Sequence, residues 1–175
     1  PEPYLRGFVL QYARALGIRD ADALVLDIRD GWGGADPRYL NLFNHNVPTL
    51  TSFLRDGTEL HYDPQWRKPV VLLVNGGTRS GNEIMAFGFK KFGIGPVVGS
   101  TTAGAVVGGK PFLLSDASLL YLAVRDALVD GIRLEGVGVA PDHPVPFDVR
   151  YAAGNDPQLE KALDVAAETV GTGAS

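Results

Sequence analysis

A single serine follows a glycine turn at the point where a buried strand gives way to a helix. Val70–Val74 is an uninterrupted apolar run, Asn75–Gly77 interrupts it, and Ser80 precedes a helical pattern that ends near Phe92. Free backbone N–H groups and the positive end of the helix dipole favour negative charge at such a position. A serine there could attack a carbonyl group while nearby amides hold the oxyanion that forms. An ordinary N-cap serine has the same local pattern, so this stretch by itself leaves both interpretations open.

A second apolar strand also ends in a glycine-rich turn. Residues 23–28 have the strand pattern, and Arg29–Gly34 follows with three glycines. A third loop, Gly99–Ala105, follows another short apolar run. Ligand sites in open α/β sheets lie outside the carboxyl ends of the strands. We therefore expect the first and third loops to converge on the turn that carries Ser80.

Helical and strand patterns alternate along the chain, which predicts an α/β fold with a mostly parallel central sheet and flanking helices. Apolar residues at helical spacing mark the expected helices, which are 4–16, 37–43, 80–92 and 157–170. Apolar runs mark the expected strands, which are 23–28, 70–74, 95–98, 111–114 and 118–124. We also expect one hairpin around Asp56–Gly57 and another across residues 127–139, and the prolines at 141, 144 and 146 are expected to end the sheet.

Composition limits the class of protein. The 175 residues carry a net charge of −4 and are 45% hydrophobic, which suits one globular domain. There is no basic run that would favour nucleic acid or an anionic membrane, and no apolar stretch long enough for a transmembrane helix. Without cysteine, a disulfide framework, a thiolate nucleophile and a cysteine-based zinc site are excluded. We find neither metal-ligand spacing nor a dinucleotide fingerprint, so no cofactor is expected.

Four segments, in order, resemble one known family. Asp27–Gly34 resembles the Asp-Leu-Arg-x-Asn-x-Gly-Gly segment of the C-terminal processing (tail-specific) serine peptidases and their tricorn-like relatives. Asn75–Glu83 resembles the serine segment of that family, and Val97–Ala105 and Glu135–Asp142 resemble the two segments that follow. The resemblance covers roughly residues 5–145 and implies the crotonase/ClpP-like α/β spiral fold.

The resemblance implies roles for residues in both glycine turns. The family's nucleophile lies three residues before a glutamate, which places it on Ser80. One oxyanion donor comes from the first glycine turn, here Gly33 or its neighbour Gly34, and the other from the residue after the nucleophile, here Gly81. Glycine lets backbone approach a substrate closely, although a plain tight turn has the same composition. Gly34 and Trp32 are expected to bind substrate, and a packing lid is the alternative for Trp32.

One position departs from the tail-specific branch, which uses a serine–lysine dyad. The aligned residue is Ala105, and alanine cannot take the serine proton. Lys110 lies five residues further on, where a solvated lysine at a strand edge is the simpler interpretation. The loop instead resembles the tricorn-like branch, whose members use serine, histidine and glutamate. The glutamate of that branch corresponds to Glu135, which would orient the imidazole, and a surface glutamate at a strand end is the alternative.

The histidine of this triad has no matching position in the chain. In tricorn-like relatives it comes from a segment well before the first glycine turn, so we expect the equivalent segment to precede Pro1. His45, His61 and His143 are interpreted as ordinary surface imidazoles. Residues 1–175 are then expected to form a single serine-peptidase-like catalytic core that lacks upstream parts and is inactive in isolation.

The sequence thus predicts a serine peptidase that cleaves peptides or unfolded proteins through Ser80. A catalytically inactive relative that binds peptides or apolar ligands is the alternative, since the lysine is absent and the histidine unmatched. An acyl-transfer or hydration enzyme of crotonase-like architecture is a third reading, but no basic cluster suits an acyl-CoA. A homo-oligomer and a location in the bacterial periplasm or outside the cell are further expectations.

Overall fold

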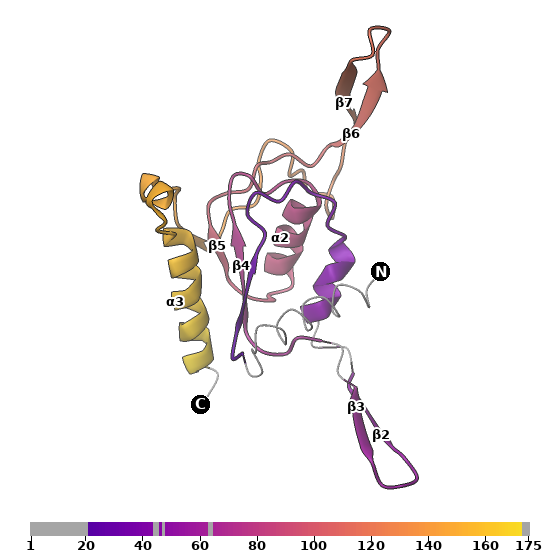
Figure 1. Cartoon of the computed structure of the whole chain (residues 1–175), viewed down its shortest axis with the longest axis vertical. Coiled ribbons are helices and arrows are strands. Elements are labelled where there is room, and N and C mark those ends of the chain that lie inside the picture. Colours follow the sequence, from indigo (N-terminus) through magenta and orange to yellow (C-terminus); the bar gives the residue numbers. More distant parts are fainter. Residues whose placement is uncertain (1–20, 44–45, 47, 63–64, 173–175) are drawn as a thin grey trace.

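Four parallel strands form the centre of the protein, for which we describe a computed structural model covering residues 21–43, 46, 48–62 and 65–172 (Figure 1). The strands are β1 (Leu24–Asp27), β4 (Val70–Val74), β5 (Val97–Gly99) and β8 (His143–Pro144), in the spatial order β1-β4-β5-β8. Each neighbouring pair is parallel. The predicted mostly parallel sheet is therefore confirmed, and its central strand has the bounds that the apolar run indicated.

Helices cover both faces of this sheet. The α-helix α2 (Gly81–Lys91) and the 3-10 helix η1 (Pro37–Phe43) lie on one side, and α3 (Pro157–Thr172) lies on the other (Figure 1). The predicted helix at 4–16 lies outside the described residues. Within the described part of the chain, no helix is long and apolar enough to cross a membrane.

Strand β4 is buried on both faces, which explains why its sequence is continuously apolar. Successive side chains of a strand point to opposite faces. Val70, Leu72 and Val74 pack with α2 and η1 in one core cluster. Val71 and Leu73 pack with α3 in the other. The core thus lies on both sides of β4 and fixes the carboxyl end of this strand, which leads directly to Ser80.

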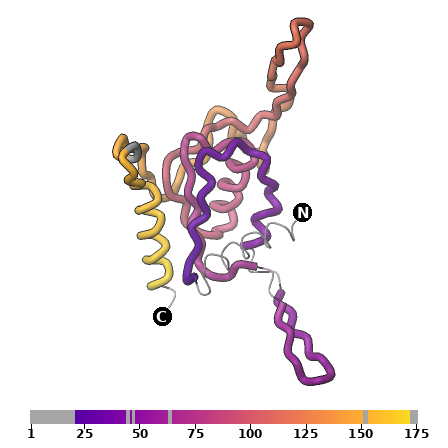
Figure 2. The backbone as a smooth tube through the Cα atoms, viewed as in Figure 1, coloured from indigo at the N-terminus to yellow at the C-terminus, as the bar shows by residue number. Residues whose placement is uncertain are grey.

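Two β-hairpins project away from the body of the protein (Figures 1 and 2). One joins β2 (Leu50–Phe53) to β3 (Glu59–Tyr62), with Asp56–Gly57 in its turn as predicted. The other joins β6 (Gly108–Leu113) to β7 (Leu119–Arg125). Every residue of β3 and β7 is exposed, so the hairpins contribute little to the core.

Two predictions after β7 hold only in part. The Asp130–Gly131 turn forms, with φ of 50° and 78° and two hydrogen bonds of 2.9 Å between Val129 and Ile132, but no strands extend from this isolated bridge. Glycines with φ of 73° at 136 and 138 then turn the chain. The sheet does not stop before Pro141, because Pro144 belongs to β8 and pairs with Gly99, although β8 is the last strand of the described residues. Proline lacks a backbone N–H but is tolerated on an edge strand, and β8 is the edge.

Candidate active site

Three loops that follow parallel strands meet around Ser80. The amide of Arg79 donates a hydrogen bond to the carbonyl of Gly31 in the loop after β1 (2.9 Å). The amide of Ser80 donates to the carbonyl of Ala105 in the loop after β5 (2.9 Å). A further bond joins the amide of Ala103 to the carbonyl of Thr78 (3.0 Å). The convergence of the three loops that the sequence predicted is thus observed.

Asn75 joins the first two loops at the end of β4. Its Oδ1 accepts hydrogen bonds from the amides of Asp30 (3.0 Å) and Gly77 (2.9 Å). Its Nδ2 donates to Oδ1 of Asp30 (3.1 Å). A Cβ atom at Gly77 would lie 2.1 Å from that same carboxylate oxygen and 3.0 Å from the Cα of Asp30, so a side chain at this position would displace Asp30. Asp30 therefore shapes the turn and does not face Ser80 as an acid or base.

Ser80 has a strained backbone at the start of α2. Its φ of 53° and ψ of −122° lie outside the β region that an ordinary N-cap residue adopts. A residue other than glycine at such angles costs about 1–3 kcal/mol and persists only where its surroundings impose it. A sharp, strained turn from strand to helix is how nucleophile elbows expose a serine hydroxyl. The half-buried Ser80 thus occupies the cap position with the backbone of a nucleophile elbow.

Gly33 lies directly against the Ser80 side chain. A Cβ atom at Gly33 would be 2.7 Å from the Cβ of Ser80 and 3.2 Å from its Oγ. The φ of Gly33 is 113°, a value that residues with a side chain rarely adopt. Its neighbour Gly34 is exposed, with φ of 76° and no atom within 4 Å of the place a Cβ would take. The first glycine turn therefore puts backbone, and no side chain, beside the Ser80 hydroxyl.

Gly81 lets the first loop pack onto the start of α2. A Cβ atom at Gly81 would lie 2.3 Å from the carbonyl oxygen and 2.7 Å from the amide nitrogen of Ala35. Both of these atoms belong to backbone, so the contact cannot be relieved by rotating a side chain. The structure thus brings Gly33, Gly81 and Ser80 together.

Replacing Gly81 by alanine is expected to lower the free energy of unfolding by about 1–3 kcal/mol, because the loop after β1 must move away from α2. Gly76→Ala is the matched control. A Cβ there would meet only the carbonyl oxygen of Thr101, at 3.9 Å, so we expect a change within about 0.5 kcal/mol. Urea denaturation measures both variants, and equal midpoints would contradict the close packing at Gly81.

Glu83 holds the three loops together from inside the protein. It is fully buried and lies in the first turn of α2. Its carboxylate accepts hydrogen bonds from the hydroxyl of Thr102 (2.6 Å) and from the amides of Gly104 (2.7 Å), Ala105 (2.8 Å) and Ser80 (3.1 Å). Sequence reasoning missed this role and used Glu83 only to locate the serine. The capping-box spacing of Ser80 and Glu83 was the signal that could have found it.

Glu135 lies on the neighbouring segment and is half-buried. Its Oε2 accepts hydrogen bonds from the amides of Val106 (2.7 Å) and Val107 (3.1 Å). These residues directly follow Ala105, whose carbonyl accepts the amide of Ser80. Glu135 is therefore anchored to the same loop as Ser80. It does not lie on a regular strand.

Among the described residues, no histidine or lysine side chain is hydrogen-bonded to Ser80. His61 lies on the exposed β3, with Nδ1 3.1 Å from Oγ1 of Thr51. Neither His61 nor His143, which lies on β8, is hydrogen-bonded to Ser80 or Glu135 within the described part of the chain. His45 is outside the described residues. Lys110 is exposed on β6, with Nζ 5.5 Å from the ring centre of Phe112, which fits a solvated lysine.

The comparison with known families decides what kind of domain this is. The sequence profile of Peptidase family S41 matches residues 6–145. The chain belongs to peptidase family S41. Family membership makes the chain a serine-peptidase domain, as the four sequence segments indicated.

Individual relatives agree with this assignment. The tricorn protease of Thermoplasma acidophilum is 34% identical over 155 residues, which cover 83% of this chain and 14% of the relative. The chloroplastic carboxyl-terminal-processing peptidase 2 of Arabidopsis thaliana is 32% identical over 137 residues, covering 73% of this chain and 27% of the relative. A crystal structure of the tricorn protease superposes with a TM-score of 0.71 and 28% identity, covering 85% of this chain and 15% of that one.

The S41 chain thus spans about one seventh of the length of the tricorn protease. These relatives are named as proteases and peptidases, which gives the alternative of an inactive binding module no support.

Arg29 of the S41 segment anchors the first loop to the opposite layer. Its guanidinium donates two hydrogen bonds of 2.8 Å to the carboxylate of Asp156, just before α3, and others to Asp27. The hydrogen bond to Asp27, together with that to Asp156, raises the pKa of Arg29. The same contact with Arg29 lowers the pKa of the Asp156 carboxyl below its usual value. Asp27 is therefore structural, and Arg29 links the first loop to Asp156 beside α3.

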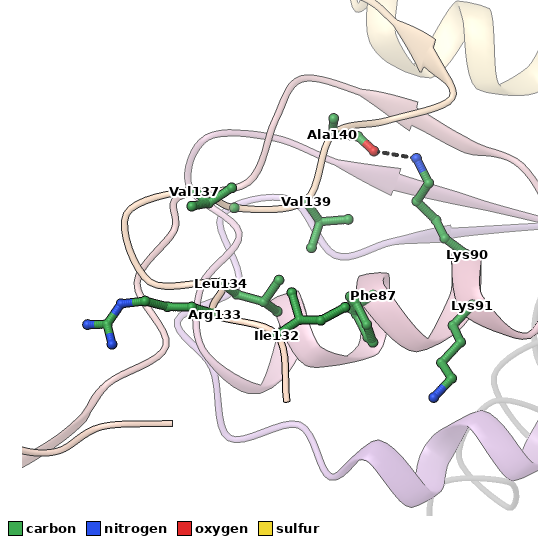
Figure 3. A pocket seen from close by; sticks show the side chains of 10 residues that line it. Phe87, Lys90, Lys91, Ile132, Arg133, Leu134, Val137, Val139 and Ala140 are labelled. Atoms are coloured by element: carbon green, nitrogen blue, oxygen red, sulfur yellow. Dashed lines mark hydrogen bonds between the residues drawn. The ribbon is translucent and has the colours of Figure 1, made fainter. Parts of the chain in front are cut away.

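A pocket of about 520 Å³ lies away from Ser80, between α2 and residues 132–140 (Figure 3). Its lining is mainly apolar and includes Phe87, Leu134 and Val139. The cations at its rim are neutralised, because Lys90, Lys91 and Arg133 each form an ion pair with an aspartate. Neither Ser80 nor the glycines beside it line this pocket, so it is separate from the candidate active site.

Proposed function

We propose that this S41 domain is the catalytic core of a peptidase that hydrolyses peptide bonds through Ser80. The observation that carries the proposal is the strained Ser80 backbone with Gly33 packed against the serine side chain. In this mechanism Oγ of Ser80 attacks the carbonyl carbon of the scissile bond and gives its proton to a base. The amides of Gly33 and Gly81 stabilise the oxyanion, and each such donor contributes about 3 kcal/mol to the transition state.

The base we propose is a histidine from outside these 175 residues, oriented by Glu135. The histidine takes the Ser80 proton and then gives it to the leaving amine, after which water hydrolyses the acyl-enzyme. The anchored position of Glu135 beside the loop at Ala105 supports its part in this arrangement. The absence of an imidazole from Ser80 among the described residues supports an external histidine.

Peptides or unfolded proteins are the proposed substrates. Gly34 and Trp32 are exposed next to Gly33 and are proposed to line the path of the chain that is cleaved. We also propose that residues 1–175 form a single catalytic core. The protein is further proposed to assemble into a homo-oligomer.

The location of the base is testable in the full-length protein. We expect His61→Gln, His143→Gln and Lys110→Gln to change peptide turnover by less than about threefold, because none of these side chains is hydrogen-bonded to Ser80 within the described part of the chain. Glu135→Gln is expected to lower turnover about a hundredfold or more, because the imidazolium loses its carboxylate partner. A hundredfold loss in any of the first three variants, with an unchanged melting temperature, would show that the base lies within this chain.

A further inference from the structure

Two exposed residues, Arg79 and Trp32, adjoin residues of the candidate site along the chain. Arg79 precedes Ser80, and Trp32 precedes Gly33. The guanidinium carbon of Arg79 lies 5.4 Å from the centre of the Trp32 ring. The two loops are joined at this point, since the amide of Arg79 donates to the carbonyl of Gly31. Arg79 and Trp32 thus form one unit, which we call the Arg79–Trp32 stack, at the edge of the site.

Arg79 has no acidic partner among the described residues. Four other described arginines are paired with aspartates, namely Arg29, Arg38, Arg133 and Arg150. Arg79 differs from them in contacting an aromatic ring. The Arg79 guanidinium contacts the face of the Trp32 ring, which leaves the N–H groups of its planar fork open to a ligand. The exposed guanidinium of the residue before Ser80 is therefore available to an anionic group of a substrate.

The indole of Trp32 is not packed in the core, so burial does not explain a tryptophan at this position. Trp32 is 85% exposed, although tryptophan is usually among the more buried residues. A flat ring beneath a guanidinium restricts the orientations of the long arginine side chain. The indole therefore holds Arg79 in place while its outer edge remains open to a peptide.

The Arg79–Trp32 stack lies at the start of a helix. The N-terminus of α2 adds partial positive charge at the same place. The carboxylate nearest to it in sequence, Glu83, faces the interior and accepts four hydrogen bonds there. Asp30 is engaged by Asn75. Neither carboxylate forms an ion pair with Arg79.

We propose that the Arg79–Trp32 stack binds a carboxylate of the substrate next to the scissile bond. Arg79 would hold the carboxylate with paired N–H groups, and Trp32 would contact the adjoining apolar part of the peptide. The carboxylate belongs either to an aspartate or glutamate side chain or to the end of the peptide. This inference rests on the proposed function, because it takes the bond cleaved by Ser80 as its reference point.

Binding to the full-length Ser80→Ala variant tests the proposal without any turnover. The probes are fluorescein-labelled, otherwise neutral ten-residue peptides in which one aspartate is moved along the sequence, each made with a free or an amidated C-terminus. Each peptide has a partner with asparagine in place of aspartate. Binding is measured by fluorescence anisotropy. If the carboxylate is a side chain, we expect the aspartate peptide to bind about fivefold more tightly than its asparagine partner at one position; if it is the C-terminus, we expect the same preference for the free acid over the amide.

Variants of Arg79 show whether the preference depends on this side chain. Arg79→Gln is expected to abolish it, and Arg79→Glu to reverse it in favour of a matched lysine peptide. Raising the salt concentration to about 0.5 M is expected to weaken it, because the contact is exposed. Arg150→Gln removes the same charge from an exposed site near α3 and is expected to leave the preference unchanged.

Two outcomes would overturn the proposal. One is equal binding of every aspartate and asparagine pair and of acids and amides. The other is a carboxylate preference that persists in Arg79→Gln. Neither outcome bears on Ser80 as the nucleophile, because that is decided by turnover and labelling of the unmodified protein.

Discussion

Replacing Ser80 by alanine is expected to lower peptide turnover by about a millionfold, because the attacking hydroxyl is removed while the rest of the site stays in place. The Cβ that packs against Gly33 is retained, so the fold should not change. Ser115→Ala, at the exposed tip of the β6–β7 hairpin, is the matched control and should keep full activity. The measurement is kcat/KM on a fluorogenic peptide with the full-length protein.

Glycine at the same position separates catalysis from stability. Ser80→Gly is equally inactive, but it relieves the strain of φ 53° and ψ −122°. The strain costs about 1–3 kcal/mol, and glycine offsets part of the gain by about 0.5–1 kcal/mol through the greater entropy of the unfolded chain. We therefore expect Ser80→Gly to unfold at a higher urea concentration than Ser80→Ala. A lower midpoint would mean that the serine backbone is not strained.

Replacing Glu83 by glutamine is expected to lower the free energy of unfolding by about 3 kcal/mol and peptide turnover by about a thousandfold. Four donors converge on the buried carboxylate, and glutamine offers one oxygen to them while its NH₂ group meets N–H donors. The amide of Ser80 is among these donors, so the backbone that presents the nucleophile loses a constraint. Urea denaturation and peptide kinetics measure the two effects.

Glu160→Gln is the control for Glu83. Glu160 also lies in the first turn of a helix, α3, but it is exposed. Glu160→Gln should lower the free energy of unfolding by no more than about 1 kcal/mol, because a helix-dipole contact on the surface is weak. If the two variants unfold at the same midpoint, the carboxylate of Glu83 does not hold the three loops together.

The elements that could be predicted correctly from the sequence are those whose local residue pattern reflects their burial. The run Val70–Val74 is apolar because both faces of β4 are covered, so its bounds could be read directly. The glycine turns after two parallel strands must lie at the same edge of the sheet, which is why the contact between Gly31 and Arg79 follows from topology.

Features that depend on distant residues could not be predicted in the same way. Three of the four donors to Glu83 come from a loop about twenty positions away, and the local sequence pattern does not identify them. The backbone angles of Ser80 are imposed by contacts with Ala105 and Glu83. Asp130–Gly131 is typical of a hairpin, but only a single bridge forms beside it, since glycines further on turn the chain and Glu135 binds the loop at Val106.

The most direct test of Ser80 as the nucleophile is mass spectrometry of the full-length protein after reaction with a fluorophosphonate. Such a reagent phosphonylates an activated serine hydroxyl and releases fluoride, and peptide mapping identifies the residue that carries the added mass. We expect one adduct, on the peptide that contains Ser80, and none in Ser80→Ala. An adduct on a different residue, or no adduct on a protein that cleaves peptides, would contradict the assignment of Ser80.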